Sequence, residues 1–147
     1  MRKFDPFHDP YLADPYPFFA EARAAWEEIC ADPLLIPNAI EEVLRFDSSV
    51  IAWRRKTTAE VKIGSVHVPA DANLLLLLGS ANRDPAVFED LEHFDIHRQN
   101  AREHLSLGFG AHYCLGAPLA RLETRVVLEE LSDRWHSSSS GTPDAPG

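Results

Sequence analysis

A glycine-rich loop with a cysteine near its end constrains this chain more than any other segment. Cys114 lies in the run Leu107-Gly108-Phe109-Gly110-Ala111-His112-Tyr113-Cys114-Leu115-Gly116-Ala117-Pro118, and an amphipathic pattern typical of a helix follows at once. Glycine lets a backbone approach a flat, bulky group closely, and a helix N-terminus favours the thiolate form of a nearby cysteine. The combination predicts a thiolate that binds iron, with a buried inert thiol as the alternative.

This loop resembles the cysteine-ligand loop of the cytochrome P450 family of haem-thiolate monooxygenases. The family pattern is Phe-x-x-Gly-x-His/Arg-x-Cys-x-Gly, followed by a helix that begins near Leu-Ala-Arg. The matching residues here are Gly110, His112, Cys114, Gly116 and Leu119-Ala120-Arg121. Leu107 stands where the pattern has phenylalanine, so the apolar cover is kept and the ring contacts are lost. The resemblance implies that Cys114 is the axial iron ligand of haem b, iron protoporphyrin IX.

The resemblance also implies which residues hold the haem. Arg54, nine residues after Arg45, matches a position where bacterial members bind a haem propionate, and His112 is expected to hold propionate as well. Arg55 is expected to face another direction, because side chains alternate along a strand. The expected cofactor-binding residues are Arg54, Leu107, Gly108, Phe109, Gly110, His112, Cys114 and Gly116.

A glutamate and an arginine are predicted to pair on a helix that begins at Pro37 and runs to about Phe46. Glu42 and Arg45 are three residues apart, so they share one helical face. Alone, this spacing indicates an ordinary exposed ion pair. Its place upstream of the cysteine loop matches the Glu-x-x-Arg pair that is structural in the family. The third partner in the family is an arginine, and its position falls on His93, which implies a weakened brace.

The remaining pattern predicts a mainly α (α+β) fold with a small mixed β-sheet. The resemblance implies that this is the proximal haem side of a partial P450 fold. Helices are predicted over about 15–29 and 115–135, with a short helix and an irregular meander over 80–98. The second helix carries an apolar stripe of Leu119, Leu122 and Val126.

Strands are predicted at four places upstream of the meander. A strand over 73–78 is expected to be buried, because it is a continuous apolar run. A type II′ turn at Gly64-Ser65 is expected to join two short strands into a hairpin. The predicted strands cover residues 50–58, 61–63, 66–68 and 73–78.

Two pieces that the family keeps far apart are adjacent in this chain. Residues 4–19 resemble the N-terminus of bacterial members, whereas the chain from about Trp26 resembles their late helical region. The junction near Ala25 and Trp26 is therefore predicted to be an internal deletion, and we also expect a C-terminal truncation. The predicted parts are an N-terminal segment over 1–25, a haem-ligand part over 26–135 and a disordered tail over 136–147.

Charge, hydrophobicity and cysteine content indicate which kinds of partner and which cellular compartment suit this chain. The 147 residues carry a net charge of -9, which disfavours nucleic acid and anionic membrane as partners. The longest apolar run, Leu74 to Leu78, is far shorter than the roughly 20 residues that cross a bilayer. Cys30 and Cys114 form no ligand-spaced pair, and the chain opens with charged residues. We expect a cytoplasmic protein with a ferredoxin-type electron donor and a small-molecule substrate whose identity the sequence does not give.

The resemblance implies an oxidoreductase that uses O2, a haem-thiolate monooxygenase. No segment matches the family's distal helix with its acid/alcohol pair, so no intact catalytic residues are expected and turnover by this chain alone is not expected. One alternative is a zinc site around Cys114 built from His93, His97, His104 and His112, although their spacing fits no common finger. The other is a noncatalytic truncated fragment that binds a partner through exposed apolar surface.

Overall fold

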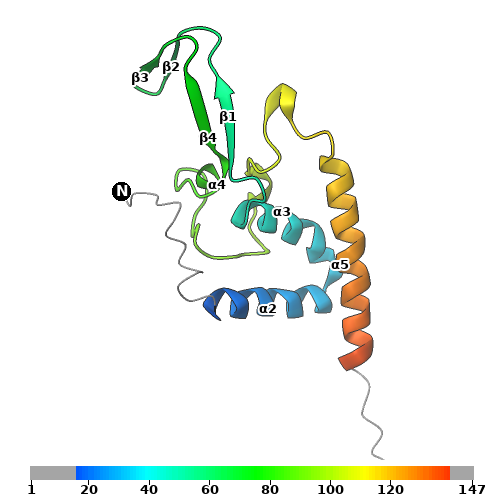
Figure 1. The fold of residues 1–147 in the computed structure, drawn as a ribbon. Coiled ribbons are helices and arrows are strands. Elements are labelled where there is room, and N and C mark those ends of the chain that lie inside the picture. Colours follow the sequence, from blue (N-terminus) through cyan, green and yellow to red (C-terminus); the bar gives the residue numbers. More distant parts are fainter. Residues whose placement is uncertain (1–15, 140–147) are drawn as a thin grey trace, which may run out of the picture.

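The computed structural model describes residues 16–139. It consists mainly of three helices, α2, α3 and α5, and a β ribbon that projects from them (Figure 1). The long helices are α2 (Tyr16–Ala31), α3 (Ile36–Phe46) and α5 (Ala117–Ser139). The predicted helices are therefore confirmed, and α5 continues into the segment expected to be a disordered tail. The resemblance over residues 4–15 and the rest of the tail lie outside the described residues. None of the described helices combines the length and apolar character needed to cross a bilayer.

The apolar core lies where α2 meets α3. Ala25 and Ile29 of α2 pack with Ile36 and Ile40 of α3, and each of these side chains is buried. Their spacing by three or four residues puts them on one face of each helix. The chain turns between the helices at η1 (Pro33–Leu35), where the Asp32 carboxylate accepts the Leu34 N–H at 3.1 Å. This cap and Pro33 explain why α2 ends and η1 begins here, and α3 then starts at Ile36 with a proline in its first turn and no side-chain cap.

The strands form two separate antiparallel pairs, so the expected mixed sheet is wrong. β1 (Ala52–Lys56) pairs with β4 (Asn73–Leu77), and β2 (Val61–Ile63) pairs with β3 (Val66–Val68). Gly64 has φ +60°, and Ser65 is not among the described residues with positive φ, as a type II′ turn requires. The β2–β3 hairpin lies within the segment that joins β1 to β4, so neither antiparallel pair needs a crossover connection.

The strand over 73–78 is not buried, contrary to expectation. Leu75 is 60% exposed and Leu76 is 39% exposed, because the ribbon of β1 and β4 projects away from the helices and no second layer formed by residues 16–139 covers it (Figure 1). Burial begins at Leu78, where α4 (Leu78–Ala81) returns the chain to the helices. An apolar run predicts a strand but does not supply the layer that would bury it.

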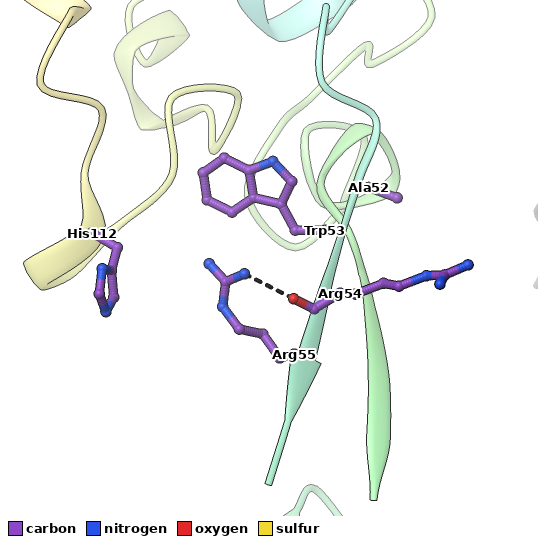
Figure 2. A pocket seen from close by; sticks show the side chains of 5 residues that line it. All are labelled: Ala52, Trp53, Arg54, Arg55 and His112. Atoms are coloured by element: carbon purple, nitrogen blue, oxygen red, sulfur yellow. Dashed lines mark hydrogen bonds between the residues drawn. The ribbon is translucent and has the colours of Figure 1, made fainter.

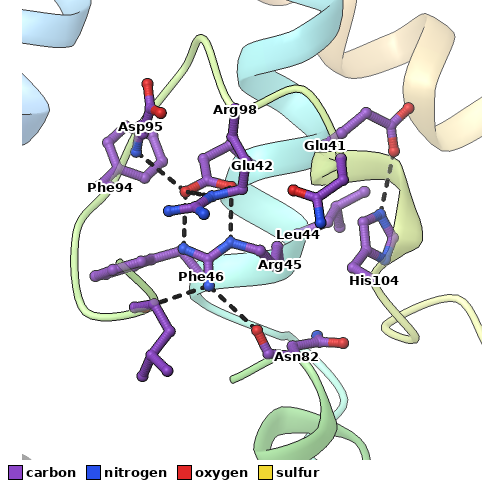
Figure 3. A network of polar contacts seen from close by, with 12 residues as sticks. Glu41, Glu42, Leu44, Arg45, Phe46, Asn82, Phe94, Asp95, Arg98 and His104 are labelled. Carbon is purple, nitrogen blue, oxygen red and sulfur yellow. Dashed lines mark hydrogen bonds and ion pairs between the residues drawn. The ribbon is translucent and has the colours of Figure 1, made fainter. Parts of the chain in front are cut away.

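The predicted pair on α3 is a buried ion pair rather than an exposed one. Arg45 donates from Nε and Nη2 to the two carboxylate oxygens of Glu42, both at 2.7 Å, and neither side chain is exposed (Figure 3). Arg45 also donates to the carbonyl oxygens of Asn82, Leu91 and His93. Arg45 thus holds the irregular segment that follows α4. This segment has little regular secondary structure of its own.

The third partner of this pair is Arg98, so the assignment to His93 is wrong. Arg98 Nε lies 3.2 Å from both Glu42 oxygens, whereas the His93 side chain is 70% exposed and pairs with Glu21 at 3.3 Å. His93 contributes its carbonyl oxygen, which accepts from both arginines. The meander brings Arg98 under α3, and the Asp95 N–H also donates to Glu42 at 3.0 Å. The brace is complete in this chain.

Replacing Arg45 by alanine tests whether this brace holds the meander. We expect Arg45→Ala to lower the free energy of unfolding by about 3–5 kcal/mol, because the carboxylate of Glu42 then loses two buried charge-assisted bonds. Urea denaturation measures this loss. Arg23→Ala is the matched control, since Arg23 pairs with Glu27 at 3.0 Å on an exposed surface, where a pair contributes about 0–1 kcal/mol. Equal losses in the two variants would contradict the proposed role of the brace.

Candidate functional site

The cysteine loop enters α5 through a short turn. The Cys114 N–H donates to the Leu107 carbonyl at 2.9 Å, and the Ala117 N–H donates to the Cys114 carbonyl at 3.2 Å. Between them η3 (Gly110–His112) forms one tight turn. Cys114 is a free, partly exposed thiol, as the sequence pattern requires of a ligand. Cys30 is buried instead, and burial together with the nearby Glu27 raises the pKa of its thiol, so Cys30 is the inert cysteine.

Two of the loop glycines are required by the backbone, and one of them also by packing. Gly108 has φ +79° and Gly110 has φ +69°, conformations that other residues adopt at a cost. A Cβ on Gly108 would lie 2.9 Å from two ring carbons of Trp53 in β1, closer than real Cβ contacts. A Cβ on Gly116 would lie 3.7 Å from the Cys114 sulfur, which is an ordinary contact. The loop therefore packs against the ribbon through Gly108 and Trp53.

An open cleft of about 550 Å³ separates β1 from η3, within the range typical of small-molecule sites. The Arg55 guanidinium lies over the Trp53 ring at 5.0 Å, and its Nη1 donates to the Arg54 carbonyl at 2.9 Å. These contacts hold the guanidinium on the side of the strand that faces His112 (Figure 2). The residues lining the cleft are Ala52, Trp53, Arg54, Arg55 and His112.

The structure corrects which arginine faces His112. Arg54 lines the cleft, but its side chain points to the opposite side of β1, whereas Arg55 and Trp53 point toward His112 (Figure 2). Alternation along the strand does put Arg54 and Arg55 on opposite sides, but it is Arg54 that lies on the side away from the loop. In the part of the chain that the structure describes, Arg55 has no carboxylate partner. The wall of the cleft is therefore basic in a protein whose net charge is -9.

The other predicted site residues do not line this cleft. Leu107 lies in a second, apolar cavity of about 260 Å³ between α3 and α5, together with Leu44 and Leu128. Phe109 is 84% exposed, and neither Cys114 nor Gly116 is among the cleft residues. The loop thus separates a basic cleft on one side from an apolar cavity on the other.

The apolar stripe of α5 is exposed. Leu119 and Leu122 are each 57% exposed and Val126 is 48% exposed, and Leu115 extends the stripe into the loop. The helix packs on the rest of the molecule through another face that includes Ala117, Leu128 and Ser132. Core packing is therefore not the role of this stripe within the described residues. A continuous apolar surface next to the cysteine loop is available to another group.

A second buried carboxylate lies beside the first on α3, and the sequence patterns did not single it out. Glu41 accepts from His104 at 3.1 Å and from Arg121 at 2.7 and 2.8 Å. Burial of Glu41 opposes ionisation, but the hydrogen bonds from His104 and Arg121 outweigh it and lower the pKa of Glu41 to about 2. No spacing in the sequence points to Glu41, because its partners His104 and Arg121 lie 63 and 80 residues away.

The zinc alternative is wrong. His93, His97 and His104 each pair with a different glutamate, namely Glu21, Glu28 and Glu41. No group of three metal-ligating side chains occurs within residues 16–139. The histidines cluster in the sequence, but the meander points them at separate carboxylates on α2 and α3.

The cytochrome P450 family model matches residues 26–138 of this chain. The chain belongs to the cytochrome P450 family. Its P450 relatives include 20-oxo-5-O-mycaminosyltylactone 23-monooxygenase of Streptomyces fradiae, 44% identical over 75% of this chain and 26% of that protein. Cyclomarin C epoxidase CymV of Salinispora arenicola is 44% identical over 86% of this chain and 33% of that protein.

The fold agrees with the family assignment. The crystal structure of the Tepidiphilus thermophilus P450 heme domain superposes with a TM-score of 0.73 and 51% identity over 80% of this chain and 28% of that one. The predicted α+β partial P450 fold is therefore confirmed. This chain spans about a quarter to a third of the length of these P450 proteins. The family match begins at Trp26, the first residue of the predicted haem-ligand part.

Substituting alanine at Gly108 tests the contact between loop and ribbon. We expect Gly108→Ala to lower the free energy of unfolding by about 2–4 kcal/mol, from the positive φ together with the clash with Trp53. Gly110→Ala is the matched control, because Gly110 shares the positive φ but a Cβ there meets nothing within 4 Å. It should cost about 1–2 kcal/mol. Urea denaturation of both variants gives the difference, and equal losses would contradict the packing role.

Proposed function

We propose that this chain binds haem b through the Cys114 thiolate and forms the proximal part of a P450 monooxygenase. The observation that carries the proposal is the basic cleft between β1 and the cysteine loop. Arg55 and His112 face each other across it, and Arg55 has no carboxylate partner within the described residues. Haem b carries two propionate carboxylates, and an arginine that no acid neutralises suits one of them.

The remaining surface also suits a flat apolar group. The loop lies at the start of the exposed stripe of Leu115, Leu119, Leu122 and Val126. Of the two cysteines, Cys114 is the partly exposed one and Cys30 is buried. The residues present therefore fit haem, with Cys114 as the iron ligand and Arg55 and His112 as the propionate partners. Arg55 replaces Arg54 in this role.

Bound haem would supply the activation of O2, with the thiolate donating electron density to the iron. The residues of this chain would hold the ligand sulfur, bind the propionates and cover the proximal side. The proposed reaction class is oxidation of a small molecule with O2, with electrons from a ferredoxin-type donor. Catalytic residues of the distal side are not part of the proposal, and we do not expect turnover by this chain alone.

A second candidate function is noncatalytic association with another protein chain. The exposed stripe on α5 favours it, because large apolar patches tend to associate. The two candidates differ in their dependence on Cys114, since association through α5 does not require a thiol.

Cys114→Ser tests the haem proposal directly. We expect haem-reconstituted wild-type chain to give the reduced carbon-monoxide spectrum typical of thiolate ligation, and Cys114→Ser to lose it. Cys30→Ser is the matched control and should retain the spectrum, because Cys30 is buried in α2. Absence of a thiolate spectrum in the wild-type chain, together with self-association that Cys114→Ser leaves unchanged, would favour the second candidate.

Arg55→Leu tests the corrected propionate assignment. We expect it to weaken haem affinity about tenfold or more, since a charge-assisted bond contributes about 1.5–3 kcal/mol. Arg54→Leu changes the same residue type one position earlier, on the other side of β1, and should change the affinity less than threefold. Haem titration followed by absorbance measures both. A larger effect of Arg54→Leu would return the role to Arg54.

A further inference from the structure

The second carboxylate of α3 binds both ends of the cysteine loop. Glu41 is 1% exposed and its side chain points toward His104, away from the Glu42 brace (Figure 3). At the exit of the loop, Arg121 Nε and Nη2 donate to the two oxygens of Glu41 at 2.7 and 2.8 Å. Such a bidentate pair fixes the plane of the guanidinium as well as its position.

The remaining nitrogen of Arg121 reaches the residue next to the thiolate. Nη1 donates to the Tyr113 hydroxyl at 2.8 Å, and Tyr113 directly precedes Cys114. Two of the three guanidinium nitrogens are already held by Glu41, so the direction of the third is set by α3. The position of the Tyr113 ring therefore depends on Glu41 through Arg121.

At the entry of the loop, His104 is oriented from both of its nitrogens. The Ser106 N–H donates to His104 Nδ1 at 3.2 Å, so this nitrogen carries no proton. Nε2 must then carry the proton, and it donates to Glu41 at 3.1 Å. The ring thus links the backbone at Ser106 to the same carboxylate that holds Arg121.

Between these two anchors Gly108 packs against Trp53, but residues 109–116 have few other contacts. Phe109 is 84% exposed and Leu115 is fully exposed, so packing contributes little to the position of residues 109–116. Within the described residues, the bond that the Tyr113 hydroxyl accepts from Arg121 is the only hydrogen bond made by a side chain of residues 109–116. The backbone bonds of residues 109–116 stay within the loop and the first turn of α5.

We infer that Arg121, oriented by Glu41, is a positioning residue for Cys114 and acts through the Tyr113 hydroxyl. The inference rests on the proposed function, because it assigns Arg121 a role toward the haem-ligating thiolate. Arg121 touches neither the sulfur nor any reacting atom in this role. It holds the residue before the ligand, so that the sulfur stays at one place relative to α5 and the cleft.

Tyr113→Phe is the sharpest test, because it removes one hydroxyl from a side chain that is 43% exposed and should leave the fold intact. In the haem-free full chain, we expect hydrogen exchange of residues 107–116 and alkylation of Cys114 to accelerate about fivefold, equivalent to ~1 kcal/mol at 298 K. Arg121→Lys should do the same, because an ammonium cannot bind Glu41 in a bidentate manner and reach Tyr113 as well. Peptide mass spectrometry separates Cys114 from Cys30.

Arg125→Lys is the matched control on the same helix. Arg125 pairs with Glu129 at 2.6 Å on the exposed surface, and we expect its loop exchange to equal that of the wild type. Unchanged exchange and alkylation in both Tyr113→Phe and Arg121→Lys would overturn the inference. Acceleration spread evenly over α2, α3 and the loop would also overturn it, since that pattern marks a general loss of stability.

Haem-loaded protein distinguishes failure of this inference from failure of the proposed function. We expect Tyr113→Phe and Arg121→Lys to bind haem but to show a reduced thiolate fraction in the carbon-monoxide spectrum. If wild-type chain shows no thiolate spectrum, the proposed function fails. Exchange in the haem-free chain then still decides whether Arg121 positions the loop, but the role toward a ligand is lost.

Discussion

Buried charge on one short helix holds the irregular half of this molecule in place. The adjacent residues Glu42 and Glu41 of α3 are both almost fully buried, and their side chains point in different directions because successive helical residues are rotated by about 100°. Glu42 binds Arg45 and Arg98 and so holds the meander, whereas Glu41 binds His104 and Arg121 and so holds the cysteine loop. Segments with little regular structure thereby acquire fixed positions.

This arrangement explains how the cysteine loop is held in position with few apolar contacts around it. The apolar core lies between α2 and α3, away from the cleft, and the stripe of α5 is exposed. Near the loop, position is set by charged hydrogen bonds instead, and no buried side-chain polar atom in the described part of the chain lacks a partner. A fully satisfied buried network specifies geometry, because each displaced group would leave a costly unpaired charge.

Local patterns predicted most of the elements and the loop that carries Cys114. The helices, the Gly64 turn, the Glu42–Arg45 pair and the loop around Cys114 all follow from short spacings, which depend on residues near one another in the chain. Assignments that depended on an irregular path were less successful. Arg98 rather than His93 completes the brace, because a meander has no period from which its facing residues could be counted.

The sequence by itself determined the family, the candidate iron ligand and the pairing of Glu42 with Arg45, since each depends only on residues that lie close together in the chain. Alternation also separated Arg54 from Arg55, but it could not say which of them faces His112. Only the tertiary structure decided this, because the loop and the strand are far apart in the chain and meet through Gly108 and Trp53. It likewise joined Glu41 to His104 and Arg121, 63 and 80 residues away, contacts that no local pattern encodes.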